Sequence, residues 1–167
     1  MPPDANPQRV PQLQSAIAQA CVDAATPGWQ SIDMTAMAVA GVGSSMAWAR
    51  RLDGDESLLV DGLTREDLDL QDAMYQRGTG TWFSFTCTIN ADGAYHFTFN
   101  YDEHVPFADG EEPLRDSWIK ELRRHPRPWH LIPDWHPVKH DYTEQQWADD
   151  VAAYEASDDY RDPAGRR

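Results

Sequence analysis

Histidines and carboxylates are the residues of this chain whose types and spacing come closest to a metal or catalytic site. The densest group consists of His130, Asp134, His136, His140 and Asp141. A zinc site needs ligands at fixed spacings, and no Cys or Glu stands at a familiar zinc spacing from these histidines. Pro137 also disfavours a helix that would place His136 and His140 on one face. We therefore predict no metal site and no bound cofactor.

A second group of polar side chains follows the aromatic run at 97–101. It contains one histidine and five acids, namely Asp102, Glu103, His104, Asp109, Glu111 and Glu112. His104 could serve as a general base with Asp102 or Glu103, which defines an alternative interpretation as a small hydrolase or ligand-binding domain. No nucleophile accompanies this histidine, and residues 105–107 (Val-Pro-Phe) break the ligand spacing of a calcium loop. We interpret the five acids as a solvated acidic rim.

A third group, Gly41-Val42-Gly43-Ser44-Ser45, superficially resembles a phosphate-binding loop. No Gly-Lys-Thr sequence follows it, and it joins a strand to a strand rather than a strand to a helix. Ser44 and Ser45 also lack a nucleophile-elbow pattern. We predict a turn at this position and, across the chain, no catalytic residue set and no enzyme.

The composition limits the class of partner. The 167 residues include 28 Asp and Glu against 14 Lys and Arg, and the net charge of −14 opposes binding to nucleic acid and to anionic membranes. No apolar run approaches the roughly 20 residues of a membrane span, and the start MPPDANPQR lacks the regions of a signal peptide. We expect a cytoplasmic protein with one domain over residues 1–156 and a disordered tail over residues 157–167.

Apolar periodicity predicts the elements that position these groups. A first helix is indicated by apolar residues at helical spacing, Val10, Leu13, Ile17, Cys21 and Ala24, and it ends before Pro27-Gly28. From Trp29 the period changes to two, which predicts a hairpin with the three-residue loop Gly41–Gly43. In that register Ala38 faces Met46 and Ala36 faces Trp48. A short strand is expected at Ser57–Val60.

The segment Gly78–Glu103 predicts an aromatic hairpin. With a two-residue Asp92-Gly93 turn, the apolar residues of each strand would lie opposite the polar residues of the other strand. A three-residue loop Ala91–Gly93, with Gly93 in the left-handed conformation, aligns the two apolar rows. The aligned pairs are Ile89 with Tyr95, Cys87 with Phe97, Phe85 with Phe99, and Phe83 with Tyr101. Cys87 and Cys21 are therefore expected to be buried free thiols.

Two further helices flank this hairpin. Thr64 is expected to cap the first of them, with Asp67 at the capping-box position, and the helix should run to about Gln76. The second is predicted over Pro113–Arg124, because Leu114, Trp118 and Leu122 form one stripe.

The four prolines of Pro126–Pro137 predict an irregular arm. Thr143 then opens a last helix, with Gln146 in the capping-box position and Tyr142 and Trp147 as its hydrophobic staple. Strand pairs followed by helices, without repeated strand-helix-strand alternation, predict an α+β fold. We expect an antiparallel sheet of about five strands, made of two hairpins plus a short strand, covered by helices.

Five short segments of the sequence resemble a known protein family. They are Thr81-Trp82-Phe83-Ser84, the turn Asn90-Ala91-Asp92-Gly93, the run Phe97-Thr98-Phe99-Asn100-Tyr101-Asp102-Glu103, the helix Trp118-Ile119-Lys120-Glu121-Leu122, and Ile132-Pro133-Asp134-Trp135. Together they resemble the YezG-like immunity proteins, which are antitoxins of bacterial polymorphic toxin systems. The resemblance covers roughly Ala16 to Trp135, and the segment from His136 onward departs from the shorter members of that family.

The resemblance implies an α+β protein without catalysis that binds and blocks a cognate toxin made by the same cell. Toxins of this kind include nucleases, and NAD-degrading glycohydrolases are further expected targets. Because an active site built for phosphates is usually lined with cations, an acidic inhibitor suits it. From the residues alone, we predict that the Gly41–Ser45 tip inserts into the toxin's cationic cleft and that the acidic rim speeds encounter.

Overall fold

The computed structural model describes residues 7–107 and 109–163. Its helices are α1 (Arg9–Ala24), α2 (Leu63–Met74), α3 (Arg115–Arg124), α4 (Pro137–Asp141) and α5 (Glu144–Glu155), with a 3-10 turn η1 (Trp129–Leu131). Its strands are β1 (Ser31–Val39), β2 (Val42–Arg50), β3 (Glu56–Leu58), β4 (Ser84–Asn90) and β5 (Tyr95–Asn100). The strands pair in the antiparallel order β3-β2-β1-β4-β5, which confirms the predicted α+β fold.

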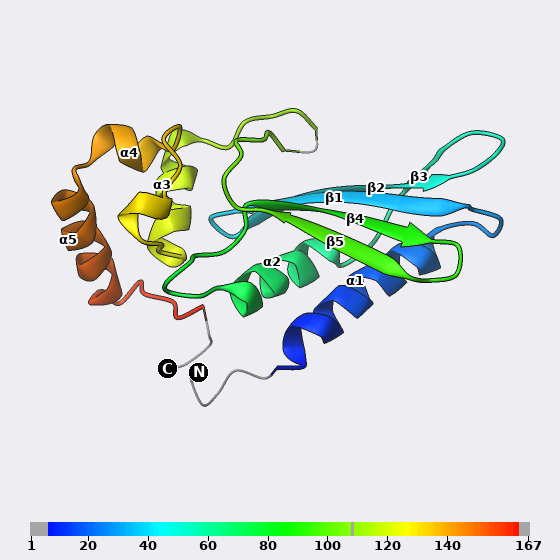
Figure 1. The fold of residues 1–167 in the computed structure, drawn as a ribbon, viewed down its shortest axis with the longest axis horizontal. Coiled ribbons are helices and arrows are strands. Elements are labelled where there is room, and N and C mark those ends of the chain that lie inside the picture. The colour runs from blue at the N-terminus through cyan, green and yellow to red at the C-terminus, as the bar shows by residue number, and fades with distance from the viewer. Residues whose placement is uncertain (1–6, 108, 164–167) are drawn as a thin grey trace.

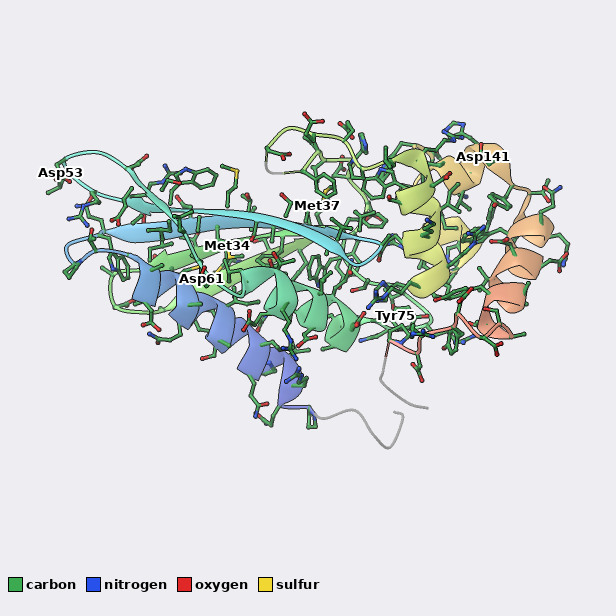
Figure 2. The ribbon with its side chains drawn as sticks, turned by 180° about the vertical axis from the view of Figure 1, so that it is seen from behind. Met34, Met37, Asp53, Asp61, Tyr75 and Asp141 are labelled. Carbon is green, nitrogen blue, oxygen red and sulfur yellow. The ribbon has the colours of Figure 1, made fainter. Side chains whose placement is uncertain are left out.

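Helices α1 and α2 lie side by side under one face of the sheet, while α3, α4 and α5 gather at one end of it (Figure 1). Side chains of β1 belong to two separate cores, because alternate residues of a strand point to opposite faces of the sheet. Met34 belongs to the core under α1 and α2, with Leu13 and Ile17. Met37 belongs to a second core with Trp118 of α3 (Figure 2 labels both methionines). The end helices are thus attached to the sheet by apolar contacts on the face opposite α1 and α2.

The aromatic hairpin has the predicted register. Ile89 lies opposite Tyr95, Cys87 opposite Phe97 and Phe85 opposite Phe99. Gly93 has a φ of 85°, its N–H donates to the Asn90 carbonyl, and the Asn90 N–H donates to the Ala94 carbonyl, as in the predicted three-residue loop.

The fourth predicted pair of this hairpin, Phe83 with Tyr101, is wrong. The ladder ends at Ser84 and Asn100, and the Asn100 carbonyl also accepts from the Phe83 N–H. Phe83 and Ser84 thus both lie opposite Asn100, as at a bulge, in which two residues of one strand oppose one residue of the other. Phe83 therefore joins the second core, whereas Tyr101 packs against the first.

The predicted register of the first hairpin is also wrong. The turn has two residues, Ala40 and Gly41, with φ values of 53° and 76°, and Val39 pairs directly with Val42. Two positive φ values match the right-handed twist of paired strands, which favours this tight turn over a longer loop. Trp48 consequently lies opposite Asp33, on the face without α1 and α2, and Met46 lies opposite Thr35. The third strand is three residues long, shorter than predicted.

The capping box predicted for the second helix is absent. Gly62, in the left-handed conformation, precedes Leu63 as the first residue of α2, and no side chain caps this end. Asp67 instead points into the protein with an exposed fraction of 0%, and neither carboxyl oxygen has a hydrogen-bond partner within the described residues. Burial, with a smaller contribution from Glu66, raises the pKa of Asp67 to about 8. The four-residue pattern that suggests a cap therefore marks a buried acid.

The other helices follow the predictions with two corrections. Helix α3 begins at Arg115 rather than Pro113, and Leu114 of the predicted stripe is exposed. Pro137 does not prevent a helix, because it occupies the first position of α4, where its missing N–H is not needed. The Thr143 capping box of α5 is confirmed, as is the ring contact between Tyr142 and Trp147.

The predicted buried thiols are confirmed, since Cys21 and Cys87 are both free and buried. Burial raises the pKa of each thiol to about 12. Of the tail predicted as disordered, residues 157–163 follow α5, with Tyr160 in ring contact with Tyr154, and residues 164–167 lie outside the described residues. Across the described ranges no helix is both long enough and apolar enough to cross a membrane.

The buried acid under α2 gives a test of this core. The pKa of Asp67 in the folded protein, about 8, lies above its unfolded value of about 3.9, so the folded state binds the extra proton and stability falls as pH rises between these values. We expect Asp67→Asn to raise the free energy of unfolding at pH about 7 by about 2 kcal/mol or more, since an amide needs no proton. Urea unfolding at several pH values measures the effect.

The matched control is Asp69→Asn, because Asp69 is on the same helix, is only partly buried and pairs with Arg9. That control should leave the pH dependence unchanged. A constant difference between Asp67→Asn and the wild type across this pH range would contradict the assignment.

Candidate protein-interaction surface

The acids of the predicted rim follow β5, and we call residues 102–107 and 109–112 the acidic segment. In Figure 1 it runs from the end of β5 toward α3. Asn100 fixes its start. The Oδ1 atom of Asn100 accepts from the N–H groups of Asp102 and Glu103, and its Nδ2 donates to Ser84 Oγ and to the Glu103 carbonyl. The first two acids are therefore held against the end of the sheet.

Aromatic side chains support the middle of the acidic segment. Trp135 Nε1 donates to the Asp102 carbonyl at 2.6 Å. The His104 ring lies 4.8 Å from the ring of Trp135 and 5.8 Å from that of Trp118, and His104 Nε2 lies 3.0 Å from a Glu112 oxygen. The irregular arm predicted over Pro126–Pro137 thus supplies a tryptophan that anchors this surface.

Arg127 joins three loops beneath the acidic segment. Its guanidinium donates to the carbonyls of Thr81, Tyr101 and Leu131, and it lies 4.5 Å from the centre of the Phe83 ring. Burial lowers the pKa of Arg127, opposed by Asp102, whose carboxylate is 3.8 Å away. A side chain at Gly80 would meet Arg127 at 2.8 Å, so the close approach of this loop requires glycine. Arg127 therefore holds the backbone at Tyr101, the residue immediately before the acidic segment.

The acids of this segment are exposed and mostly uncompensated. Glu112 has His104 beside it, and Asp102 has the distant Arg127. Within the part of the chain that the structure describes, no Lys, Arg or His comes within ion-pair distance of Glu103, Asp109 or Glu111. The segment therefore presents a fixed negative surface that a cationic partner would complement.

The predicted inserting tip, Gly41–Ser45, is packed rather than free. The Ala40 N–H donates to a Glu121 carboxylate oxygen at 2.5 Å, and Gly41 lies against Arg124 of α3. A side chain at Gly43 would meet Thr64 at 2.8 Å, and Ser44 and Ser45 lie within β2. Val42, with an exposed fraction of 56%, is the apolar side chain that the tip offers to solvent.

A buried charge network holds this tip in place. His125 has an exposed fraction of 1%, and its two ring nitrogens lie 2.6 Å from Glu121 and 2.6 Å from Asp72. Arg124 adds an ion pair to Asp72, and the His125 ring contacts Tyr75, labelled in Figure 2. Burial by itself would lower the pKa of His125, but the two carboxylates outweigh it and raise the pKa to about 9. The imidazole is therefore a cation bonded to α2 and α3.

The histidines singled out in the sequence have contacts other than those considered there. His104 contacts Glu112 rather than Asp102 or Glu103. Burial, with the charge of Arg127, lowers the pKa of His136 to about 3, so this ring is neutral. Its Nδ1 accepts from the Val138 N–H at the start of α4. Among the described residues, no group of three or more His, Cys, Asp or Glu side chains is arranged to hold a metal ion.

Two surface hollows lie away from the acidic segment. One, of about 520 Å³, is bounded by the start of α2 and by Arg124, and the other, of about 370 Å³, lies between Trp129 and α5. Neither is lined by His104 or by the acids next to it. The hollows therefore give no support to a catalytic role for His104.

The network around His125 was missed by sequence reasoning. Its readable signal was the spacing of Glu121 and His125, four residues apart, with Glu121 on the predicted helix and His125 directly after it. The partner in α2, Asp72, is 53 residues away in the chain, and no local pattern connects the two.

Comparison with known proteins adds no family assignment. No protein-family model matches this chain, and a search of curated proteins returns no significant match. The family resemblance therefore depends on the residues quoted for it.

The His125 network predicts a pH-dependent stability. The pKa in the folded protein, about 9, exceeds the unfolded value of 6.5, so the stabilisation is complete below about pH 6.5 and is lost as pH rises through about 9. We expect His125→Gln to lower the free energy of unfolding by about 3–5 kcal/mol at pH 6, because Glu121 keeps its burial and loses its cation. The deficit should shrink between about pH 6.5 and 9 in denaturant titrations.

His130→Gln serves as the control, because His130 is exposed. It should leave the stability unchanged over the same range. A deficit for His125→Gln that is the same at pH about 6 and about 9.5 would refute a charged His125.

Proposed function

We propose that this chain is an immunity protein that binds a bacterial toxin made by the same cell and covers the toxin's active site. The observation that carries the proposal is the acidic segment, whose backbone is held by Asn100, Trp135 and Arg127 and whose exposed acids Glu103, Asp109 and Glu111 have no cation within ion-pair distance among the described residues. A surface of this kind suits a partner with a cationic cleft. Nucleases and NAD-degrading glycohydrolases, whose substrates carry phosphates, are the toxin classes that we favour.

The physical mechanism is steering followed by exclusion. Negative charge at a fixed position attracts a cationic cleft and raises the rate of productive encounter. Because Asp102 and Glu103 are held by hydrogen bonds before binding, less conformational entropy is lost on association than a flexible acidic loop would lose. Once the acids fill the cleft, a phosphate-bearing substrate is excluded both by volume and by charge.

The fold is consistent with the family resemblance. A helix, a two-stranded unit, a second helix, the aromatic hairpin and a third helix follow one another in the order that the resemblance implies. The Asp92-Gly93 turn and the Ile132–Trp135 tail occupy defined positions, since the first closes β4 and β5 and the second supplies Trp135 to the acidic segment. These matches support the proposal without identifying the toxin.

Growth rescue tests the proposed function directly. We expect the protein encoded by the adjacent gene to arrest growth when expressed alone, and co-expression of this chain to restore growth. Colony counts over a dilution series measure the protection. A neighbour that is harmless when expressed alone, or a toxic neighbour that this chain does not neutralise, would argue against the proposal.

The same assay tests the tip separately from the acidic segment. Gly43→Trp is unsuitable, because a side chain there meets Thr64 and disturbs the fold. Val42→Glu is the better variant, since Val42 is exposed and lies beside the turn. If the tip inserts into a toxin cleft, Val42→Glu should reduce protection while the exposed control Leu52→Glu should not. Equal protection by both variants would remove the tip from the interface.

Charge reversal tests the acidic segment. Glu103 and Glu111 are suitable because only their backbone groups form hydrogen bonds and neither side chain forms an ion pair, whereas the Glu112 carboxylate contacts His104. We expect the double variant Glu103→Lys and Glu111→Lys to slow association with the toxin about tenfold at low salt, and the difference to narrow at about 0.5 M salt. Stopped-flow or surface-binding kinetics measure the rate.

The control for charge reversal carries the same change of net charge far from the acidic segment. Asp158→Lys with Asp159→Lys meets this condition, because both residues are exposed and follow α5. An equal slowing by both double variants would show that total charge, rather than the acidic segment, governs association.

A further inference from the structure

Strand β5 leaves one edge of the sheet open (Figure 1). The Asn90 N–H donates to the Ala94 carbonyl, so along β5 the residues at even positions bond to β4. The N–H and C=O groups of Tyr95, Phe97 and Phe99 consequently point away from the sheet. Within the described residues, no hydrogen bond to these groups is made by another segment.

The two edges of the sheet are not alike. β3, at the other edge, is three residues long and begins with Glu56, whose carboxylate accepts from Thr26 and lies 3.6 Å from Arg51. Short length and a charged residue are common protections against pairing with another chain. β5 is six residues long and contains no proline and no Asp, Glu, Lys or Arg. The open backbone of β5 is therefore available for strand addition.

The side chains of β5 define what an added strand would need. On the helix-covered face, Tyr95, Phe97 and Phe99 form an aromatic row, with the Phe97 and Phe99 rings stacked at 5.8 Å. On the other face, His96 and Thr98 are exposed. Because side chains of neighbouring strands contact one another on each face, the matching strand alternates apolar with polar residues.

Carboxylates flank both ends of the open edge. Asp92 lies in the turn before β5, and Asp102 and Glu103 follow it. An antiparallel pairing of β5 with a second copy would set Asp92 of one copy near Asp102 and Glu103 of the other, and two chains of net charge −14 repel. The ends of the edge instead favour basic residues.

We propose that the free edge of β5 receives an extended strand of the toxin, with alternating apolar and polar residues and with Lys or Arg at its ends. The inference rests on the proposed function for the identity of the partner. The added strand extends the sheet to six strands, and its basic ends lie against Asp92 and the acidic segment. The backbone of β5 supplies the hydrogen bonds, and the flanking acids select the charge of the added strand.

A defined peptide tests the edge independently of any toxin. The probe is a synthetic peptide of alternating valine and threonine with paired lysines at each end, compared with a peptide in which glutamates replace the lysines. We expect the lysine peptide to slow hydrogen exchange at the amides of Tyr95, Phe97 and Phe99 about tenfold, while the β3 amides are unchanged. Equal binding of both peptides, or protection at other residues alone, would overturn the inference.

A pair of variants at one position isolates the backbone contribution. Tyr95 is the first residue of β5 and is 40% exposed, a position where proline is tolerated. Tyr95→Pro and Tyr95→Ala both delete the ring, but only proline removes the outward N–H. We expect Tyr95→Pro to bind the lysine peptide about tenfold more weakly than Tyr95→Ala, with similar unfolding midpoints for the two variants. Equal peptide affinity would overturn the inference.

The toxin separates this inference from the proposed function. If the wild-type chain fails to protect cells, the proposed function fails, and the peptide measurements still decide whether β5 accepts a basic strand. If the wild type protects and the two Tyr95 variants bind the toxin equally, the edge is not the interface and the inference is overturned, while the proposed function stands. Weaker toxin binding by Tyr95→Pro than by Tyr95→Ala supports both.

Discussion

The charge network around His125 is the constraint on which the arrangement of the molecule depends. It joins Asp72 of α2, under the sheet, to Glu121 of α3 and to His125, which directly follows α3 at the end of the sheet. Glu121 also accepts a hydrogen bond from the N–H of Ala40 in the first turn. Charges removed from water are costly unless each one is paired, so these elements have one arrangement that satisfies all the groups. A shift of α3 would leave Glu121 buried without its cation.

The position of the acidic segment depends on that of α3. Trp118 of this helix is buried in the second core, and Trp135 packs on Trp118 with 5.0 Å between their rings. His104 stands against both rings, and the Asp102 carbonyl accepts from Trp135. Asn100 and Trp135 place the first acids through hydrogen bonds between neutral groups, and such bonds depend little on ionic strength. The carboxylates of Glu103 and Glu111 can therefore act on a partner without also having to hold the loop.

The sequence was most informative where one physical requirement decided the structure. In the β4–β5 hairpin both strands alternate cleanly, so only one loop length brings the apolar rows together, and that register is confirmed. In the first hairpin, Met37, Met46 and Trp48 provide apolar residues on the face opposite α1 and α2, while the core face of β2 carries Ala47 and Ala49. With apolar residues on both faces, alternation does not decide the register, and the Ala40-Gly41 turn does.

Contacts between segments that are far apart in the chain could not be predicted from the sequence. The run Thr64–Asp67 satisfies a capping pattern, yet Gly62 allows the helix to begin earlier, which turns Asp67 inward. Asp72 meets His125 only after α2 and α3 have been placed, and the Arg127 bonds to Thr81, Tyr101 and Leu131 depend on loops that no periodicity describes. The acids of the candidate surface were readable, whereas the contacts that order them were not.

Asn100 connects the two parts of the proposed interface. As the last residue of β5 it ends the open edge, and its side chain holds the first acids of the acidic segment. Charge alone attracts a partner without fixing its register, because electrostatic attraction is long-ranged and weakly directional. Backbone hydrogen bonding aligns a strand along the edge but acts only at contact. Since the two surfaces are continuous through one residue, a cationic strand attracted by the acids arrives beside the groups that can align it.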